Sequence, residues 1–144
     1  MTSEVGSPRT IGRLGGMSAE SSLEYERLIN AEVRRVLGGS HSASLLVRSY
    51  DFAVIEELQA RGAWHEAGAL LADDARHLVA AGAGLIVLCT NTMHRVAPAI
   101  EAAIDVPFLH LADATAAAVR AAGLRHVGLL GTRFTMEGDF YRDR

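Results

Sequence analysis

Lysine is absent from this chain of 144 residues, and all fourteen of its basic side chains are arginines. The absence excludes a Schiff-base lysine, a lysine general base and the lysine of a Walker phosphate-binding loop within these residues. The single cysteine, Cys89, excludes an internal disulfide framework and a zinc site built from several thiolates. Seventeen acidic residues give a net charge of −3, which argues against a nucleic-acid surface.

Long apolar runs are also missing, because none approaches the ~20 residues that a membrane-spanning helix needs. Residues 1–10 lack the apolar centre of a signal peptide, and we expect them to form a flexible tail on a cytoplasmic protein. The composition that remains, 49% hydrophobic and 22% charged, is typical of a folded globular chain of about one domain.

Short apolar runs alternate with helical patterns along the chain. The run at 84–89 is apolar without alternation, which is typical of a central parallel strand covered on both faces. The pattern predicts an α/β fold with a parallel sheet flanked by helices. We expect strands at 11–14, 43–49, 84–89, 108–111 and 126–130. We expect helices after Ser18 as far as 37, at 52–61, 64–79, 96–103 and 113–122, and from about 135.

The first four strands predict one domain over residues 11–114, and residues 115–144 are predicted to be the start of a second, incomplete lobe.

Ligands of open parallel sheets bind at the carboxyl ends of the strands. Small residues, hydroxyls and amides gather there, and with free N–H groups at helix starts they suit a compact carboxylate or another anion. These strand ends supply residues 15–18, 49–51 and 90–92, His110 with Asp113, and Thr132 with Thr135.

The glycines, the cysteine and the histidines each allow a functional and a structural interpretation. Glycines 12, 15 and 16 suggest a nucleotide-binding loop. Their spacing matches neither the dinucleotide-binding motif nor the Walker motif, however, and favours an ordinary turn. Cys89 precedes a helix start, where thiolates are stabilised, yet a cysteine that ends a buried strand is more often a small hydrophobe. A helix N-terminus disfavours a charged imidazole, so we expect His94 to be neutral, with His65 and His77 in solvent. No spacing of His, Cys and carboxylates predicts a metal site.

Three motifs in order, at residues 11–18, 88–94 and 127–137, resemble the aspartate/glutamate racemase family. They read Ile-Gly-Arg-Leu-Gly-Gly-Met-Ser, then Leu-Cys-Thr-Asn-Thr-Met-His, then Val-Gly-Leu-Leu-Gly-Thr-Arg-Phe-Thr-Met-Glu. The stretch from Asp51 to Trp64, with Gln59, is similar to the bacterial branch that acts on aspartate, glutamate or a wider set of amino acids. The resemblance runs from about Ile11 to the end of the chain.

The resemblance implies racemisation at the α-carbon of a small amino acid without a cofactor. In the family two α/β domains face each other, and each supplies one base, usually a cysteine. The first base stands directly before Asn-Thr, which here is Thr90, with Cys89 one residue too early and kept as the alternative. The second base lies in a Gly-Cys-Thr motif that these 144 residues do not contain.

The expected substrate-binding residues follow from their positions at strand ends and from the family resemblance. Successive side chains of a strand point to opposite faces, so we expect Thr90 to face the cleft and Cys89 to be buried. We expect the substrate to meet Met17, Thr90, Asn91 and Thr92 at strand ends, Gln59 by resemblance, and Thr132 and Thr135 from the second lobe. An incomplete lobe leaves apolar surface and an open sheet edge, which predicts a homo-oligomer.

Three function classes follow from the sequence: half of a racemase, an amino-acid-binding module without catalysis, and a nucleotide-binding domain. We expect the 144 residues alone to be inactive, because they offer a base on only one face of the α-carbon.

Overall fold

The computed structural model describes residues 8–144, so most of the expected N-terminal tail, residues 1–7, lies outside the described residues. Four strands form one sheet in the order β2-β1-β3-β4, and every neighbouring pair is parallel. Parallel neighbours need a crossover between them, and here the crossovers are helices. The predicted parallel α/β sheet is therefore confirmed. The strands are β1 (Ile11–Gly15), β2 (Leu45–Ser49), β3 (Leu85–Leu88) and β4 (Phe108–Leu109).

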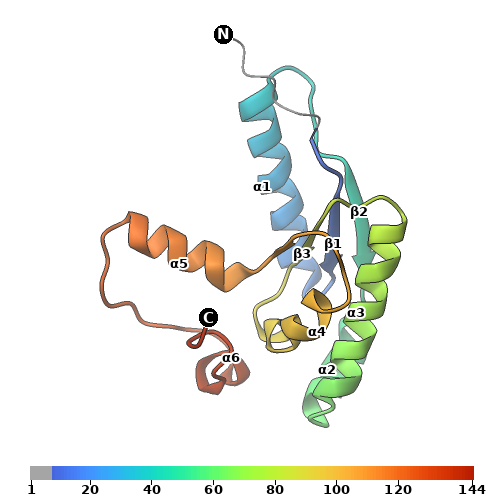
Figure 1. Cartoon of the computed structure of the whole chain (residues 1–144). Coiled ribbons are helices and arrows are strands. Elements are labelled where there is room, and N and C mark those ends of the chain that lie inside the picture. The colour runs from blue at the N-terminus through green and yellow to red at the C-terminus, as the bar shows by residue number, and fades with distance from the viewer. Residues whose placement is uncertain (1–7) are drawn as a thin grey trace.

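The helices lie on both sides of the sheet (Figure 1). Helix α1 follows β1 on one side, and α3 packs against the other. Ser18 caps α1 through its side chain, as the sequence predicts, and Asp51 caps α2 in the same way. The helices are α1 (Ala19–Leu37), α2 (Phe52–Ala60), α3 (Trp64–Ala80), the 3-10 helix η1 (Thr92–Val96), α4 (Ala97–Glu101), α5 (Leu111–Ala121) and α6 (Arg133–Glu137).

The core fills the space between the sheet and α3. Leu14 of β1 and Ile86 of β3 are fully buried there against Leu71 and Ala75 of α3. On the opposite face of β1, the buried side chain of Arg13 points toward α1 and pairs with Glu26 at 2.9 Å. Because both faces of the central strands are covered, the carboxyl edge of the sheet is the place left for a ligand.

The predicted fifth strand at 126–130 is wrong. Residues 126–130 form no strand, and every one of them is exposed. A strand needs a neighbour to receive its backbone hydrogen bonds, and within residues 8–144 the sheet ends at β4. Helix α5 leads the chain away from the sheet, and the residues after it return toward α4 (Figure 1).

Two helix boundaries also differ from the prediction. The helix expected at 96–103 is a 3-10 turn from Thr92 followed by the short helix α4, which ends at Glu101. Helix α5 begins at Leu111 rather than 113, because the His110 side chain accepts a hydrogen bond from the N–H of Ala112 and caps the helix.

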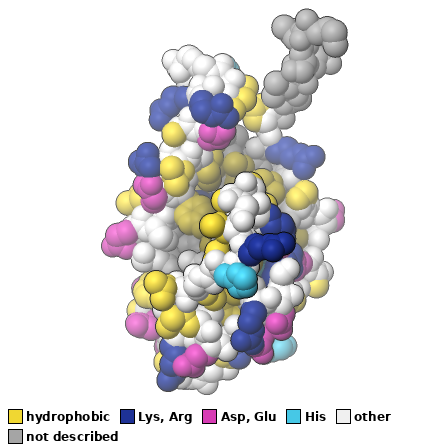
Figure 2. Space-filling view, turned by 90° about the vertical axis from the view of Figure 1, so that its left-hand side faces the viewer, with side chains coloured by type: hydrophobic (Ala, Val, Ile, Leu, Met, Phe, Trp, Pro, Cys, Tyr) yellow, Lys and Arg dark blue, Asp and Glu magenta, His cyan; other side chains and the backbone are white. Residues whose placement is uncertain are grey.

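Apolar side chains remain exposed around α5 and the residues after it. Leu109, Leu124 and Val127 are about half exposed or more, and Leu130 is 92% exposed. Seen from the side on which α5 lies, apolar side chains gather in a recess of the surface (Figure 2). Within residues 8–144, no helix has the length and apolar character to cross a membrane.

Candidate functional site

A pocket of about 310 Å³ opens at the carboxyl edge of the sheet. The loop after β1, the residues after β3 and the start of α6 meet around it. None of the side chains that line it carries a charge. The lining residues are Met17, Ser18, Ser21, Phe52, Gln59, Thr90, Asn91, Thr92, Gly131, Thr132 and Thr135.

All seven residues that the sequence analysis placed at the site line this pocket. Sequence reasoning missed Ser21, Phe52 and Gly131, and it placed Ser18 at a strand end without naming it as a substrate-binding residue. The serines had a signal, because they stand in the first turn of a helix that starts at a strand end. Phe52 had none, since a first helical residue with an apolar side chain is ordinarily assigned to the core.

Thr90 and Cys89 point in opposite directions. Thr90 lines the pocket, whereas Cys89 is fully buried on the α1 side of the sheet, beside Gly15. Burial raises the pKa of the Cys89 thiol to about 12, despite the nearby positive charge of Arg13. A buried thiol with so high a pKa holds almost no thiolate at neutral pH, so Cys89 is unsuited to act as the base.

His94 fixes the backbone of Thr90. Its Nδ1 lies 2.6 Å from the carbonyl oxygen of Thr90, and its Nε2 accepts a hydrogen bond from the N–H of Leu111 at 3.2 Å. The two bonds require a neutral imidazole, with the proton on Nδ1. Burial, and next the neighbouring His110, lower the pKa of His94 to about 4, so the ring is neutral at physiological pH. His94 therefore joins the end of β3 to the start of α5.

Three threonine hydroxyls close the opposite side of the pocket. Thr92 Oγ1 lies 3.0 Å from Thr132 Oγ1 and 3.4 Å from Thr135 Oγ1, and the last two are 3.2 Å apart. Thr132 also caps α6 by accepting from the N–H of Thr135. Hydroxyls both donate and accept, so this cluster can rearrange its hydrogen bonds around an anion.

The two amide side chains of the pocket are each held by a neighbour. Gln59 Nε2 lies 3.1 Å from the sulfur of Met93. The carboxamide oxygen of Asn91 accepts from the hydroxyl of Tyr141 at 2.9 Å. Behind Asn91, the N–H groups of Asn91, Thr92 and Met93 donate to no acceptor among residues 8–144. Asn91 and Thr92 line the pocket, whereas Met93 is buried and does not.

A buried arginine supports the loop that carries Met17. Arg13 donates to the carbonyl oxygen of Ser22, and the Ser22 hydroxyl in turn accepts from the N–H of Gly16 at 2.7 Å. The hydroxyl also donates to the carbonyl of Ser18 at 2.9 Å. This network ties β1 to the first turn of α1 and so fixes one wall of the pocket. Sequence patterns do not predict it, because Arg13 only interrupts an otherwise apolar strand.

Seven of the residues expected at the strand ends do not line this pocket: Gly15, Gly16, Ser49, Tyr50, Asp51, His110 and Asp113. Tyr50 is buried and donates to Asp74 at 2.7 Å, while Asp51 caps α2. His110 caps α5, and Asp113 pairs with Arg144 at 3.0 Å. His65 and His77 are exposed on α3, as expected.

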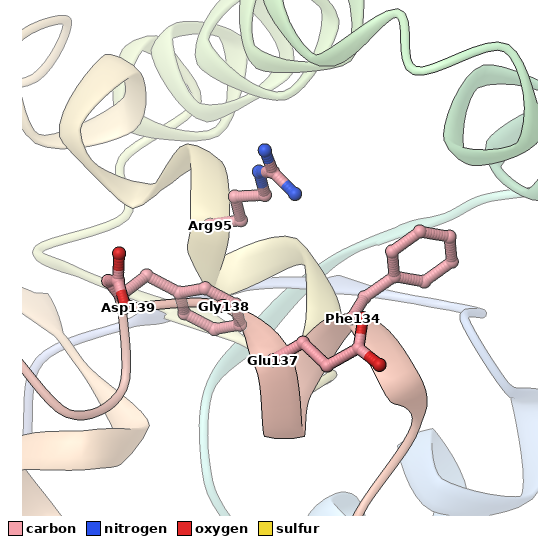
Figure 3. A pocket seen from close by; sticks show the side chains of 6 residues that line it. Arg95, Phe134, Glu137, Gly138 and Asp139 are labelled. Carbon is pink, nitrogen blue, oxygen red and sulfur yellow. The ribbon is translucent and has the colours of Figure 1, made fainter.

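A larger hollow, about 460 Å³, lies between η1 and the C-terminal residues (Figure 3). Figure 3 shows Arg95 reaching from one side and Phe134 and Glu137 lying on the other. The Arg95 guanidinium stacks over the Trp64 ring at 4.4 Å. None of the seven predicted residues lines this hollow, and it does not adjoin a strand end. We therefore take the smaller pocket as the candidate site.

Comparison with known proteins agrees with the motifs that line the pocket. The family model described as Asp/Glu/hydantoin racemase matches residues 14–144. The chain belongs to this family. Among solved structures, a protein from Yersinia pestis assigned as an Asp/Glu racemase is 53% identical, with a TM-score of 0.89 over 94% of this chain.

Two further racemase-family structures are similar. An aspartate racemase homologue from Pyrococcus horikoshii is 34% identical, with a TM-score of 0.76 over 92% of this chain. The aspartate racemase of Picrophilus torridus is 18% identical, with a TM-score of 0.74 over 94% of this chain, and at that identity it supports the fold alone. The chain spans 59% of the Yersinia protein, 58% of the Pyrococcus protein and 57% of the Picrophilus protein.

Proposed function

We propose that this chain forms one half of the site of a cofactor-independent racemase that acts on aspartate, glutamate or a broader set of amino acids. The observation that carries the proposal is the pocket itself. Thr90, Asn91 and Thr92 from the end of β3 meet Thr132 and Thr135, which follow about forty residues later, around one cavity. The family membership supplies the type of reaction.

Racemisation breaks the bond between the α-carbon and its hydrogen, and then returns a proton to the opposite face. In this proposal Thr90 stands on one face and exchanges the proton there. Asn91 and the free N–H groups at the start of η1 hold the α-carboxylate, which keeps the α-hydrogen aimed at Thr90. His94 holds the backbone of Thr90 through its carbonyl oxygen. Each of these residues lies at the same edge of the sheet.

The lining lacks a titratable side chain, and this limits what the half-site can do alone. The hydroxyl of Thr90 has no hydrogen-bond partner among residues 8–144 that could take its proton. A hydroxyl is a weak acid and a weak base, so general acid–base catalysis by Thr90 needs help from another group. We propose that the second base comes from outside these 144 residues and that the chain alone is inactive.

An amino-acid-binding module without turnover is the second candidate. The neutral lining and its hydrogen-bond donors favour it, since they suit binding of a carboxylate without any group to move a proton. It shares the pocket with the first candidate, and only proton exchange at the α-carbon separates the two.

Titration of the chain with L-aspartate, L-glutamate and ATP tests the proposal, with backbone amide shifts followed by NMR. We expect millimolar binding of an amino acid, on the order of 4 kcal/mol, with shifts centred on residues 90–92 and 132–135. Thr92→Val removes one hydroxyl of the threonine cluster and weakens binding about threefold or more. Thr115→Val, on the exposed side of α5, is the matched control and leaves binding unchanged. Tight binding of ATP, or amino-acid binding that ignores Thr92→Val, contradicts the proposed site.

A further inference from the structure

The residues after α6 come back to the pocket and touch it at one side chain. Tyr141 lies fifty positions after Asn91, and its hydroxyl donates to the Asn91 carboxamide oxygen at 2.9 Å. Tyr141 is half-buried and does not line the pocket, whereas Asn91 does. Tyr141 therefore contacts the pocket residue Asn91 from outside the pocket.

The segment that carries Tyr141 is anchored on both sides. Before it, Thr132 and Thr135 contact Thr92 through their hydroxyls. After it, the guanidinium of Arg144 pairs with Glu101 of α4 at 2.8 Å and with Asp113 of α5 at 3.0 Å. Because the segment is held on both sides of Tyr141, several contacts together keep the Tyr141 hydroxyl beside Asn91.

A carboxamide has two different edges, an oxygen that accepts and an NH₂ group that donates, and a half-turn about the last bond exchanges them. An anion needs the NH₂ edge, since the oxygen edge repels it. A hydroxyl that donates to Oδ1 occupies the accepting edge of Asn91. The Nδ2 group, which has no acceptor among residues 8–144, is then the edge left for the pocket.

We propose that Tyr141 is a positioning residue that holds the Asn91 amide with its NH₂ group toward a bound carboxylate. The inference rests on the proposed function and deepens it, because it names what orients a donor of the carboxylate site. Tyr141 itself touches neither the substrate nor the proton in transfer.

The amino-acid composition makes the test unusually direct. The chain has only two asparagines, Asn30 and Asn91, and one glutamine, Gln59, so its side-chain NH₂ groups give three pairs of NMR signals. Asn30 serves as an internal reference, since both of its amide edges are used, by Ala43 and by Glu26, far from Tyr141. Tyr25→Phe is the matched control for a lost hydroxyl, because Tyr25 is another half-buried tyrosine close to Tyr141, and its hydroxyl forms no hydrogen bond among residues 8–144.

We expect Tyr141→Phe to move the Asn91 NH₂ signals and to speed their hydrogen exchange, while the Asn30 signals stay in place. The Kd for L-aspartate or L-glutamate rises about three- to tenfold, as expected for one lost hydrogen bond. The thermal unfolding midpoint changes little, which separates positioning from a loss of folding. Tyr25→Phe changes neither the Asn91 signals nor the Kd.

Two outcomes overturn different statements. Asn91 signals that are the same in wild type and Tyr141→Phe, or an unchanged Kd, overturn the positioning role. If the Asn91 signals respond but the wild-type chain binds neither amino acid, the contact stands and the proposed function is overturned.

Discussion

At the scale of single residues, burial separates the two side chains that compete for the role of first base. Cys89 and Thr90 are neighbours in sequence, yet the thiol lies among the packed residues behind β3 and the hydroxyl lies at the pocket. The alternation of a strand predicts this separation from the sequence alone. Alternation predicts which side chain faces the pocket, but it does not predict whether that side chain can act as a base. The Thr90 hydroxyl has no partner among residues 8–144 that could activate it.

His94 makes stability depend on pH in a predictable direction. Its pKa is about 4 in the folded chain and near 6.5 when it is exposed. Between these values the unfolded chain binds a proton that the folded chain does not, so the free energy of unfolding falls as the pH falls from 6.5 to 4. The loss from His94 reaches about 3 kcal/mol, at 1.36 kcal/mol per pKa unit. Urea unfolding at a series of pH values measures it.

Variants of two histidines isolate this contribution. His94→Gln can keep both hydrogen bonds but does not titrate, so we expect its unfolding free energy to change less between pH 6.5 and 4. A residual slope remains, because burial also lowers the pKa of His110. His77→Gln, on the exposed surface of α3, is the matched control for replacing a histidine by glutamine. Identical slopes in wild type and His94→Gln would show that the imidazole is not held neutral in the fold.

At the scale of elements, the turn from β1 to α1 depends on close backbone contact. Gly16 has φ +86°, and a Cβ at this position would lie 2.4 Å from the carbonyl oxygen of Tyr50. Gly38, after α1, has a similar φ of +76° but open space around it. Both positions favour glycine for their backbone conformation, and only the first also excludes a side chain.

Replacing each glycine by alanine separates the two effects. Gly38→Ala costs about 1–2 kcal/mol of unfolding free energy, because φ +76° with ψ −175° lies in a region that residues other than glycine rarely adopt. We expect Gly16→Ala to cost at least about 2 kcal/mol, because the methyl group must also push β2 away from the turn. Urea unfolding followed by circular dichroism measures both. Equal losses would mean that β2 moves aside easily and that the loop before Met17 is less rigid than its contacts indicate.

The elements that sequence patterns predict well are those whose environment repeats along the chain. The apolar run of β3 and the stripes of α1 and α3 report burial directly, and the four parallel strands follow from them. The strand expected at 126–130 has the same local pattern but no neighbour within residues 8–144, and a local pattern carries no information about pairing partners. Local patterns likewise do not predict the contact of Tyr141 with Asn91, since fifty residues separate them.

At the scale of the whole molecule, the described residues form one four-stranded sheet and leave several large apolar side chains exposed. The site gathers at one edge of the sheet, while Leu124, Val127 and Leu130 remain exposed beyond α5. Exposed apolar groups of this kind favour association with another polypeptide surface. We expect association of two copies to cover apolar area without completing the chemistry, because a second copy brings a second Thr90 and no group of matched pKa.

Proton exchange at the α-carbon in D₂O tests this view of the whole molecule. We expect the 144-residue chain to exchange the α-hydrogen of L-aspartate and L-glutamate at least about a hundredfold more slowly than a longer family member with measured racemase activity. A two-base reaction needs groups on both faces of the α-carbon, and the residues that line the pocket around Thr90 include no titratable side chain. Mass spectrometry follows deuterium incorporation, and chiral chromatography follows the change of hand. Thr90→Val in the 144-residue chain is the control for residual exchange at this pocket. Comparable rates in the short and the long protein would show that one lobe is sufficient and that the two-face mechanism is wrong.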